Sequence, residues 1–202
     1  MAIYVDDIAV DWPGERLGEL LATASDRIEP SGRIIVEVVV DGQAIVGDEL
    51  VERRDETVTD REVRLVTADP TELTLTTLNE VRGGLQSIRD EQERAAELFQ
   101  KDQSAEALKL VGNVLQSWLH VQEAVLHSAR LAQIDLDALD VDGIPVREMT
   151  DSLLRQFEQF KEQLTHNDLF AIADALAYEW TGSIDQWDRL LEEMIRIIEE
   201  RK

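Results

Sequence analysis

The stretch Asp69–Leu131 decides the fold: DPTELTLTTLNEVRGGLQSIRDEQERAAELFQKDQSAEALKLVGNVLQSWLHVQEAVLHSARL. It opens with a helix start, in which Asp69 can cap the first turn, Pro70 has no N–H to lose, and Glu72 can reach back as in a capping box. A short polar segment at 100–104 divides the stretch, and helical periodicity runs on both sides of it. The stretch therefore predicts two long amphipathic helices joined by a tight turn.

Both predicted helices carry apolar side chains at steps of three and four residues. The first seam is Leu78, Val81, Leu85, Ile88, Gln92, Ala95 and Phe99, and the second is Leu108, Val111, Leu115, Trp118, Gln122, Val125 and Ala129. Seams of this kind need partner helices to cover them. Because the connection at 100–104 is so short, we expect the two helices to form an antiparallel hairpin.

Two further amphipathic helices follow. Residues 147–164 carry one apolar stripe and residues 168–200 carry another, and the acidic linker 133–146 is long enough to cross the end of a bundle. Four seams of matching length are enough to close a helical bundle. We therefore expect residues 69–202 to form an antiparallel four-helix bundle.

Residues 1–68 have a different sequence pattern from the rest of the chain. Residues 3–10 suggest a first strand, and residues 15–28 suggest a short helix. Residues 33–40 (RIIVEVVV) predict a strong β-branched strand that ends in an Asp-Gly hairpin turn, and residues 43–46 are its expected partner. Residues 62–66 predict a last strand. The strand 33–40 is apolar on both sides, so we expect it to be central in a sheet that is covered on both faces. The order strand, helix, hairpin, strand predicts a small mixed-sheet domain of about the size of a β-grasp unit. The predicted fold class is thus α+β, with domains 1–68 and 69–202.

The balance of acidic and basic residues limits which kinds of partner the protein can bind. The chain has 43 acidic and 20 basic side chains, a formal net charge of -23. Such a surface repels nucleic acid and anionic membranes, because binding to either depends on Lys and Arg. It attracts basic proteins or cations, and it also keeps a protein soluble. The chain has no cysteine, no signal-peptide pattern at its start and no run long enough to span a bilayer, so we expect a cytoplasmic protein.

The one metal-ligand spacing in the sequence is His120, Glu123 and His127, which lie on one face of a helix. That face is turned about 120° to 180° from the centre of the apolar stripe, so we expect it to face solvent. The bundle helices also lack the Glu-x-x-His motifs that build internal di-metal sites. The acidic linker offers only the middle of a calcium loop, because Ala138 and Met149 occupy the end positions where carboxylates belong.

The last helix holds the aromatic candidates for an interface. Tyr178, Trp180 and Trp187 are side chains of the type that often anchor protein contacts, although for Trp180 and Trp187 core packing is the favoured interpretation. Glu179 falls beside the apolar stripe. We expect either a half-buried Glu179 paired with an arginine or a helix bend at 181–183.

Motifs of nucleotide-binding and hydrolytic enzymes are missing from the sequence, so no catalytic or cofactor-binding residue is assigned. We expect a non-enzymatic interaction module, an adaptor, regulator or chaperone-like protein, that binds a protein partner through the helical bundle or a sheet edge. Bacterial secretion chaperones offer a fold-level analogy, since acidic helical bundles are common among them. Two alternatives stay open: a metal-dependent enzyme with its site at His120, Glu123 and His127, and a homo-oligomeric structural protein, for example a homodimer.

Overall fold

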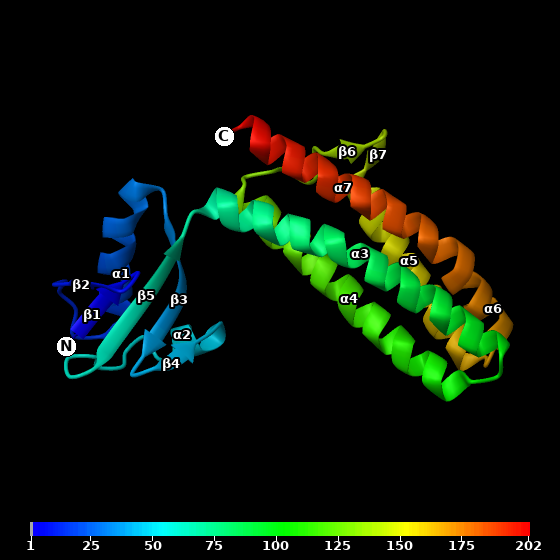
Figure 1. Cartoon of the computed structure of the whole chain (residues 1–202), viewed down its shortest axis with the longest axis horizontal. Coiled ribbons are helices and arrows are strands. Elements are labelled where there is room, and N and C mark those ends of the chain that lie inside the picture. Colours follow the sequence, from blue (N-terminus) through cyan, green and yellow to red (C-terminus); the bar gives the residue numbers. More distant parts are fainter. Residues whose placement is uncertain (1) are drawn as a thin grey trace. The chain divides into compact units, whose positions relative to one another are not determined.

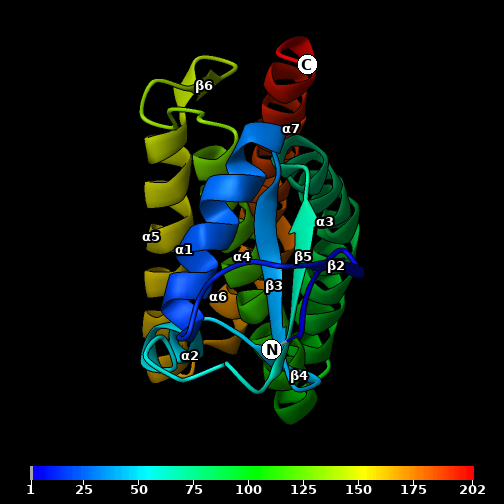
Figure 2. The ribbon, with the colours of Figure 1, turned by 90° about the vertical axis from the view of Figure 1, so that its left-hand side faces the viewer.

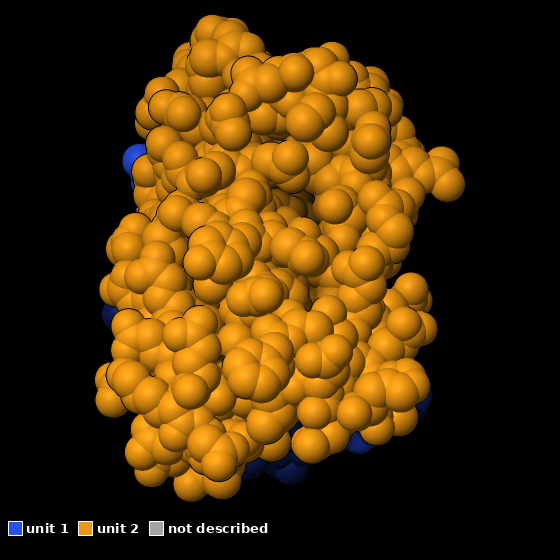
Figure 3. Space-filling model, turned by 90° about the vertical axis from the view of Figure 1, so that its right-hand side faces the viewer, with its two compact units in different colours: residues 1–73 blue, residues 74–202 orange. Residues whose placement is uncertain are grey.

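The computed structural model describes residues 2–202 and divides the chain into two compact units, residues 1–73 and 74–202. Figure 1 shows the first unit as a small sheet with helices and the second as a set of long helices. Figure 3 gives the two units different colours and shows one face of residues 74–202. The chain is therefore a mixed α+β protein with a five-stranded sheet and long helices.

The sheet unit contains five strands and three short helical segments. The strands are β1 (Ala2–Val5), β2 (Ile8–Val10), β3 (Ile34–Val40), β4 (Gln43–Ile45) and β5 (Glu62–Ala68). The helical segments are α1 (Leu17–Ile28), the 3-10 turn η1 (Glu29–Ser31) and α2 (Asp48–Glu52). The strand order is β2-β1-β5-β3-β4, with β1 parallel to β5 and the other neighbours antiparallel. The sheet unit thus contains two hairpins with α1 between them, and its last strand, β5, lies between β1 and β3.

The first hairpin corrects one expectation. Residues 3–10 were expected to form one strand, but the chain turns at Asp6 and Asp7, both with positive φ, and Ile3 pairs with Val10 across the turn. Aspartate tolerates the left-handed conformation better than most residues, because its short side chain can bond to the local backbone. The second hairpin turns at Asp41-Gly42, as predicted.

The core of the sheet unit lies between α1 and one face of the sheet (Figures 1 and 2). Its buried members are Ile3, Leu17, Leu20, Ala24, Ile28, Val38, Val40, Ile45, Val58, Val63 and Leu65. The expectation that β3 is covered on both faces is wrong for this unit, although β3 does lie inside the sheet, between β5 and β4. The central strand is β5, a bulge between Ile35 and Glu37 interrupts β3, and Val36 is 44% exposed.

The helical unit follows the predicted order. It contains α3 (Pro70–Gln100), α4 (Ser104–Leu131), the two-residue strands β6 (Asp140–Val141) and β7 (Ile144–Pro145), α5 (Val146–Thr165), α6 (Leu169–Asp174), the π-helical segment η2 (Ala175–Glu179) and α7 (Trp180–Glu200). The cap expected at Asp69 is present, since its carboxylate accepts hydrogen bonds from the backbone N–H of Thr71 at 2.8 Å and of Glu72 at 3.1 Å. α3 and α4 form a helical hairpin (Figure 1).

The last predicted helix is interrupted, but not where the glycine suggested. The irregular segment is η2, which lies before the expected bend at 181–183. A π-helical turn holds an extra residue and so rotates the side chains that follow it. Leu176 and Trp180 are both buried, whereas Glu179 is exposed. The expectation of a half-buried Glu179 paired with an arginine is therefore wrong.

Aromatic side chains and ion pairs join the helices. Trp118 of α4 packs edge-on against Trp187 of α7, with ring centroids 5.7 Å apart, and Trp180 contacts two phenylalanines of α5. On the surface, Arg82 of α3 binds Asp188 of α7 through two hydrogen bonds of 2.7 and 3.1 Å. These contacts place α7 against the other long helices of the unit.

The predicted seam of α4 is divided in the structure. The buried positions are Ala107, Val111, Val114, Trp118, Val121, Val125, Ser128 and Ala129. Leu108, expected in the core, is 43% exposed, and Leu115 and Gln122 are only half-buried. The helix carries more apolar residues than its neighbours cover, and the core lies nearer to Val114 and Val121 than the sequence pattern suggested.

Candidate functional site

His120, Glu123 and His127 lie on α4 and are all exposed, as their angle from the apolar stripe predicted. Among residues 2–202, the structure brings together no group of three or more His, Asp or Glu side chains that could hold a metal ion. His120, Glu123 and His127 therefore face solvent.

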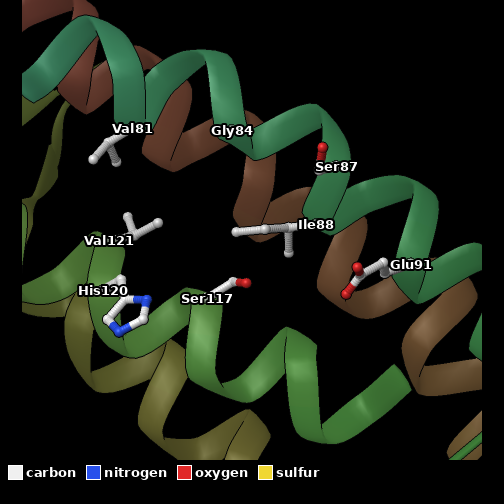
Figure 4. A pocket seen from close by; sticks show the side chains of 8 residues that line it. All are labelled: Val81, Gly84, Ser87, Ile88, Glu91, Ser117, His120 and Val121. Atoms are coloured by element: carbon white, nitrogen blue, oxygen red, sulfur yellow. The ribbon is translucent and has the colours of Figure 1, made fainter. Parts of the chain in front are cut away.

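His120 instead borders a hollow of about 260 Å³ between α3 and α4 (Figure 4). The hollow is lined by Val81, Gly84, Ser87, Ile88 and Glu91 of α3 and by Ser117, His120 and Val121 of α4. Within the described residues, the structure records no hydrogen bond that joins Ser87 or Ser117 to His120 or Glu91. A nucleophile and its base act together within hydrogen-bond reach, so the described residues give no reason to assign a catalytic pair to this hollow.

The three aromatic interface candidates differ in their exposure to solvent. Trp180 and Trp187 are buried in the core, whereas Tyr178 is 76% exposed on the π-helical segment. Only Tyr178 is thus placed for contact with another molecule. Phe170 of α6 is also exposed, and the sequence analysis did not single it out.

The acidic linker forms a small β-hairpin. Asp142 and Gly143 make its turn with positive φ angles, and the Asp140 carboxylate accepts a hydrogen bond from the Gly143 N–H at 3.2 Å. Asp142 is also paired with Arg189 of α7 at 2.9 Å. The carboxylates of Asp140 and Asp142 are therefore engaged by backbone and arginine rather than gathered around a common point.

A second hollow, of about 330 Å³, lies in the sheet unit between α1, β3 and the end of β4. Its lining residues are Leu21, Ser25, Ile35, Val36, Glu37, Val38, Ile45, Val46, Gly47 and Leu50. Most of these side chains are apolar, and Val46 is 70% exposed. We call this hollow the α1–β3 groove. Its volume and composition match those of sites that bind small ligands or side chains of a partner.

The groove runs along an open strand edge. β4 pairs with β3 only from Val38 to Val40, whereas β5 pairs with the other edge of β3 from Ile34 to Val40, with a bulge between Ile35 and Glu37. In the part of the chain that the structure describes, residues 35–37 of β3 therefore have no strand beside them on the groove side. An open edge offers backbone N–H and C=O groups to an additional strand.

Ion pairs fix the segment that follows the groove. Arg53 binds Glu49 at 3.0 Å and Glu56 at 2.6 Å, and Arg61 also binds Glu56. The hydrogen bond from Arg53 holds the pKa of the Glu56 carboxyl below its ordinary value, because it favours the ionised form. This network holds α2, and with it Leu50 at the groove wall, in a defined position.

The surroundings of the groove are acidic. The sheet unit has 18 Asp and Glu residues against seven Arg. Glu37 lines the groove and Asp48 follows Gly47 at its end, and both are exposed without an ion-pair partner among the described residues. A ligand with positive charge on either side of an apolar segment would meet complementary charge here.

The groove was not predicted from the sequence. The residues of β3 and its hairpin turn were predicted, but β3 was expected in the middle of a sheet covered on both faces. The signal was the short apolar partner 43–46, which is too short to cover a strand of seven residues.

No family model, curated protein or solved structure matches this chain. None of the helices in residues 2–202 has the length and apolar character needed to cross a lipid bilayer. The fold and the groove define a two-unit α+β protein with an open sheet edge beside an apolar hollow.

Proposed function

We propose that this chain is a non-enzymatic protein-binding module that holds an extended segment of a partner protein along β3. The observation that carries the proposal is the coincidence of the unpaired edge of β3 with the apolar α1–β3 groove. An added strand gains main-chain hydrogen bonds from the edge, and its alternate side chains fill the groove.

The acidic rim specifies the partner further. Glu37 and Asp48 border an apolar hollow in a unit with a large excess of carboxylates. The partner segment should therefore hold three or four apolar, largely β-branched residues flanked by Lys or Arg. Charge of this kind raises the rate of association and discriminates against acidic segments, while apolar burial supplies most of the affinity.

In this proposal the helical unit supports the sheet unit and does not itself bind the partner segment. Because α6, η2 and α7 follow one another as one interrupted helix, we treat residues 74–202 as an antiparallel four-helix bundle attached to the binding unit. A chain without cysteine suits a reducing compartment, and we propose a cytoplasmic location.

Selection of short random peptides on the full-length chain tests the proposal. Enriched peptides should share an apolar β-branched run with basic flanks, and their affinity should fall as salt is added. On binding, amide hydrogen exchange should slow within residues 35–37, because the N–H groups there that point to the open edge gain partners. Enrichment of amphipathic helical patterns, or no change in exchange at β3, would contradict strand addition.

Two valines provide a matched pair of variants. Val46→Asp places a charge in the groove and should weaken peptide binding by roughly tenfold or more. This factor corresponds to losing the free energy gained when the peptide buries one valine side chain. Val51→Asp changes an equally exposed valine that does not line the groove, and it should leave binding unchanged. Equal effects of the two variants would mean that the peptide binds elsewhere.

A further inference from the structure

A second apolar surface follows the exposed side of α4. Leu108, Leu119 and Leu126 are 43%, 55% and 51% exposed, and the half-buried Leu115 and Gln122 lie between them. Together with Gly112 these residues follow steps of four and three, so they form one straight stripe over three heptads. We call these six residues the α4 stripe. In heptad terms, Gly112, Leu119 and Leu126 are a positions and Leu108, Leu115 and Gln122 are d positions.

The charges of α4 set it apart from the rest of the chain. This helix of 28 residues has two acidic and two basic side chains, whereas the chain as a whole has a net charge of -23. Ion pairs join α3 to α7, but none of those found among the described residues involves Glu106, Lys109, Glu123 or Arg130 of α4. A basic partner would be drawn to the acidic helices. The near-neutral α4 is the helix on which a second copy of this acidic chain meets least repulsion.

We infer that two copies of this chain associate by antiparallel contact of their α4 helices around a two-fold axis at the level of Ser117. In an antiparallel pair, a positions face d positions. This register sets Leu126 against Leu108 of the second copy and Leu119 against Leu115. It also sets Gln122 against Gly112, where the backbone has open space beyond the Cα atom. Every large side chain of the stripe then meets an apolar or a small partner.

The charges beside the stripe fit the same register. Lys109, Gln116 and Glu123 occupy successive e positions, and e positions face each other in an antiparallel pair. Lys109 therefore lies opposite Glu123 of the second copy, Glu123 opposite Lys109, and Gln116 opposite itself. A parallel pair would instead set each stripe residue against its own copy, Gln122 against Gln122 and Gly112 against Gly112, and its e positions would face g positions, so Lys109 and Glu123 would not meet. The sequence of α4 is thus self-complementary in the antiparallel direction only.

The contact is isologous, so it closes after two copies and leaves no free stripe. It is independent of the α1–β3 groove, which belongs to the sheet unit. The two surfaces can therefore be tested separately, and failure of one proposal leaves the other standing.

Light scattering after gel filtration of the full-length chain gives the first test. The wild-type chain should have the mass of a dimer, and a monomer at all concentrations up to roughly 100 µM would overturn the inference. Leu119→Glu should weaken dimerisation by roughly a hundredfold or more, because the two-fold symmetry places the new charge in the interface twice, once from each copy. Leu131→Glu is the matched control. Leu131 is similarly exposed on α4 but lies about 140° around the helix from the stripe, so the dimer should persist.

Charge exchange tests the register itself. Lys109→Glu and Glu123→Lys should each weaken the dimer, on the order of tenfold, and the double variant should restore it. In one helix these residues are about 21 Å apart, so the rescue cannot arise within a single chain. If the double variant dimerises no more tightly than the single variants, the antiparallel register is wrong. If Leu119→Glu leaves the dimer intact, the α4 stripe is not the dimer interface. Circular dichroism checks that all variants are folded.

Discussion

The indole rings of Trp118 and Trp187 meet edge to face in the core of the helical unit, with centroids 5.7 Å apart and planes at 70°. The contact joins α4 to α7, two helices that are separated in the sequence by the hairpin linker, α5, α6 and η2. Edge-to-face pairs contribute about 0.5–1.5 kcal/mol beyond their buried area. Helices of this unit that are distant in sequence are thus held by a few large side chains.

Trp118→Ala should lower the free energy of unfolding by about 3–5 kcal/mol, because it removes a fully buried ring and leaves a cavity. Trp118→Phe should cost clearly less, since it keeps most of the packing and removes an indole N–H that has no hydrogen-bond partner among residues 2–202. Urea denaturation followed by far-ultraviolet circular dichroism measures both. A smaller effect for alanine than for phenylalanine would contradict the role of the ring pair.

Asp6 should make the sheet unit sensitive to acid. The Thr67 hydroxyl and backbone N–H donate to its carboxylate at 2.6 and 2.8 Å, and Arg33 lies 3.6 Å away, so the pKa of Asp6 is below its ordinary value of 3.8. A lowered folded-state pKa adds stability that is present above the unfolded value and is lost as pH falls through the folded value. Asp6→Asn should therefore lower stability by about 1 kcal/mol at pH 7, and the difference from wild type should shrink below about pH 4.

Asp7→Asn is the control for that measurement. Asp7 occupies the same turn with a similar positive φ, and asparagine accepts that conformation equally well. Its pair with Arg64 is largely exposed, so its loss should change stability by less than about 0.5 kcal/mol. Urea unfolding at several pH values compares the two variants. Equal effects of both at pH 7 would mean that the turn conformation, rather than the Thr67 hydrogen bonds, decides the outcome.

Local features of the fold were predictable from the sequence, because their causes lie within a few residues. The cap at Asp69, the turn at 101–103 and the hairpin turn at Asp41-Gly42 each depend on side chains at fixed short spacings. The turn at Asp6 and Asp7 was missed, since two aspartates are a weaker signal than the Asp-Gly pair. The parallel pairing of β1 with β5 was also missed, because residues about 60 positions apart have no local signal for it.

The candidate surfaces were harder to predict for a related reason. Periodicity identifies the apolar residues of a helix, but it cannot say which of two neighbouring stripes the other helices cover. In α4 the core uses Val114 and Val121, and Leu108 and Leu119 are left outside. Likewise, the edge of β3 becomes visible only once the length of β4 is known.

Two glycines should respond to alanine with opposite signs. Gly42 has φ near 80° in the β3–β4 turn, a conformation that costs an L-residue about 1 kcal/mol, so Gly42→Ala should destabilise. Gly84 lies within α3, and a Cβ there meets nothing within 4 Å, so Gly84→Ala should stabilise by about 0.5–1 kcal/mol through helix propensity. Thermal unfolding monitored by circular dichroism gives both signs. A destabilising Gly84→Ala would mean that α3 needs its backbone freedom at the hollow beside α4.

Gln92 is the most costly polar residue in the helical core. It is fully buried in α3, and neither atom of its amide group has a hydrogen-bond partner within the described residues. A buried amide without partners costs about 1–3 kcal/mol, because folding removes its water and returns no bond. Methionine has a similar volume and a flexible side chain, so it can fill the same space without this cost. Gln92→Met should therefore raise the free energy of unfolding by about 1–3 kcal/mol.

The matched control for Gln92→Met is Gln86→Met on the same helix. Gln86 is exposed and donates to Asp90 at 2.7 Å, so its replacement should change stability by no more than about 0.5 kcal/mol. Urea denaturation of both variants separates the effect of the core from that of helix propensity, which is the same for the two exchanges. If Gln92→Met instead destabilises, the amide must be bonded to water inside the core, and the free-energy gain expected from an apolar side chain disappears.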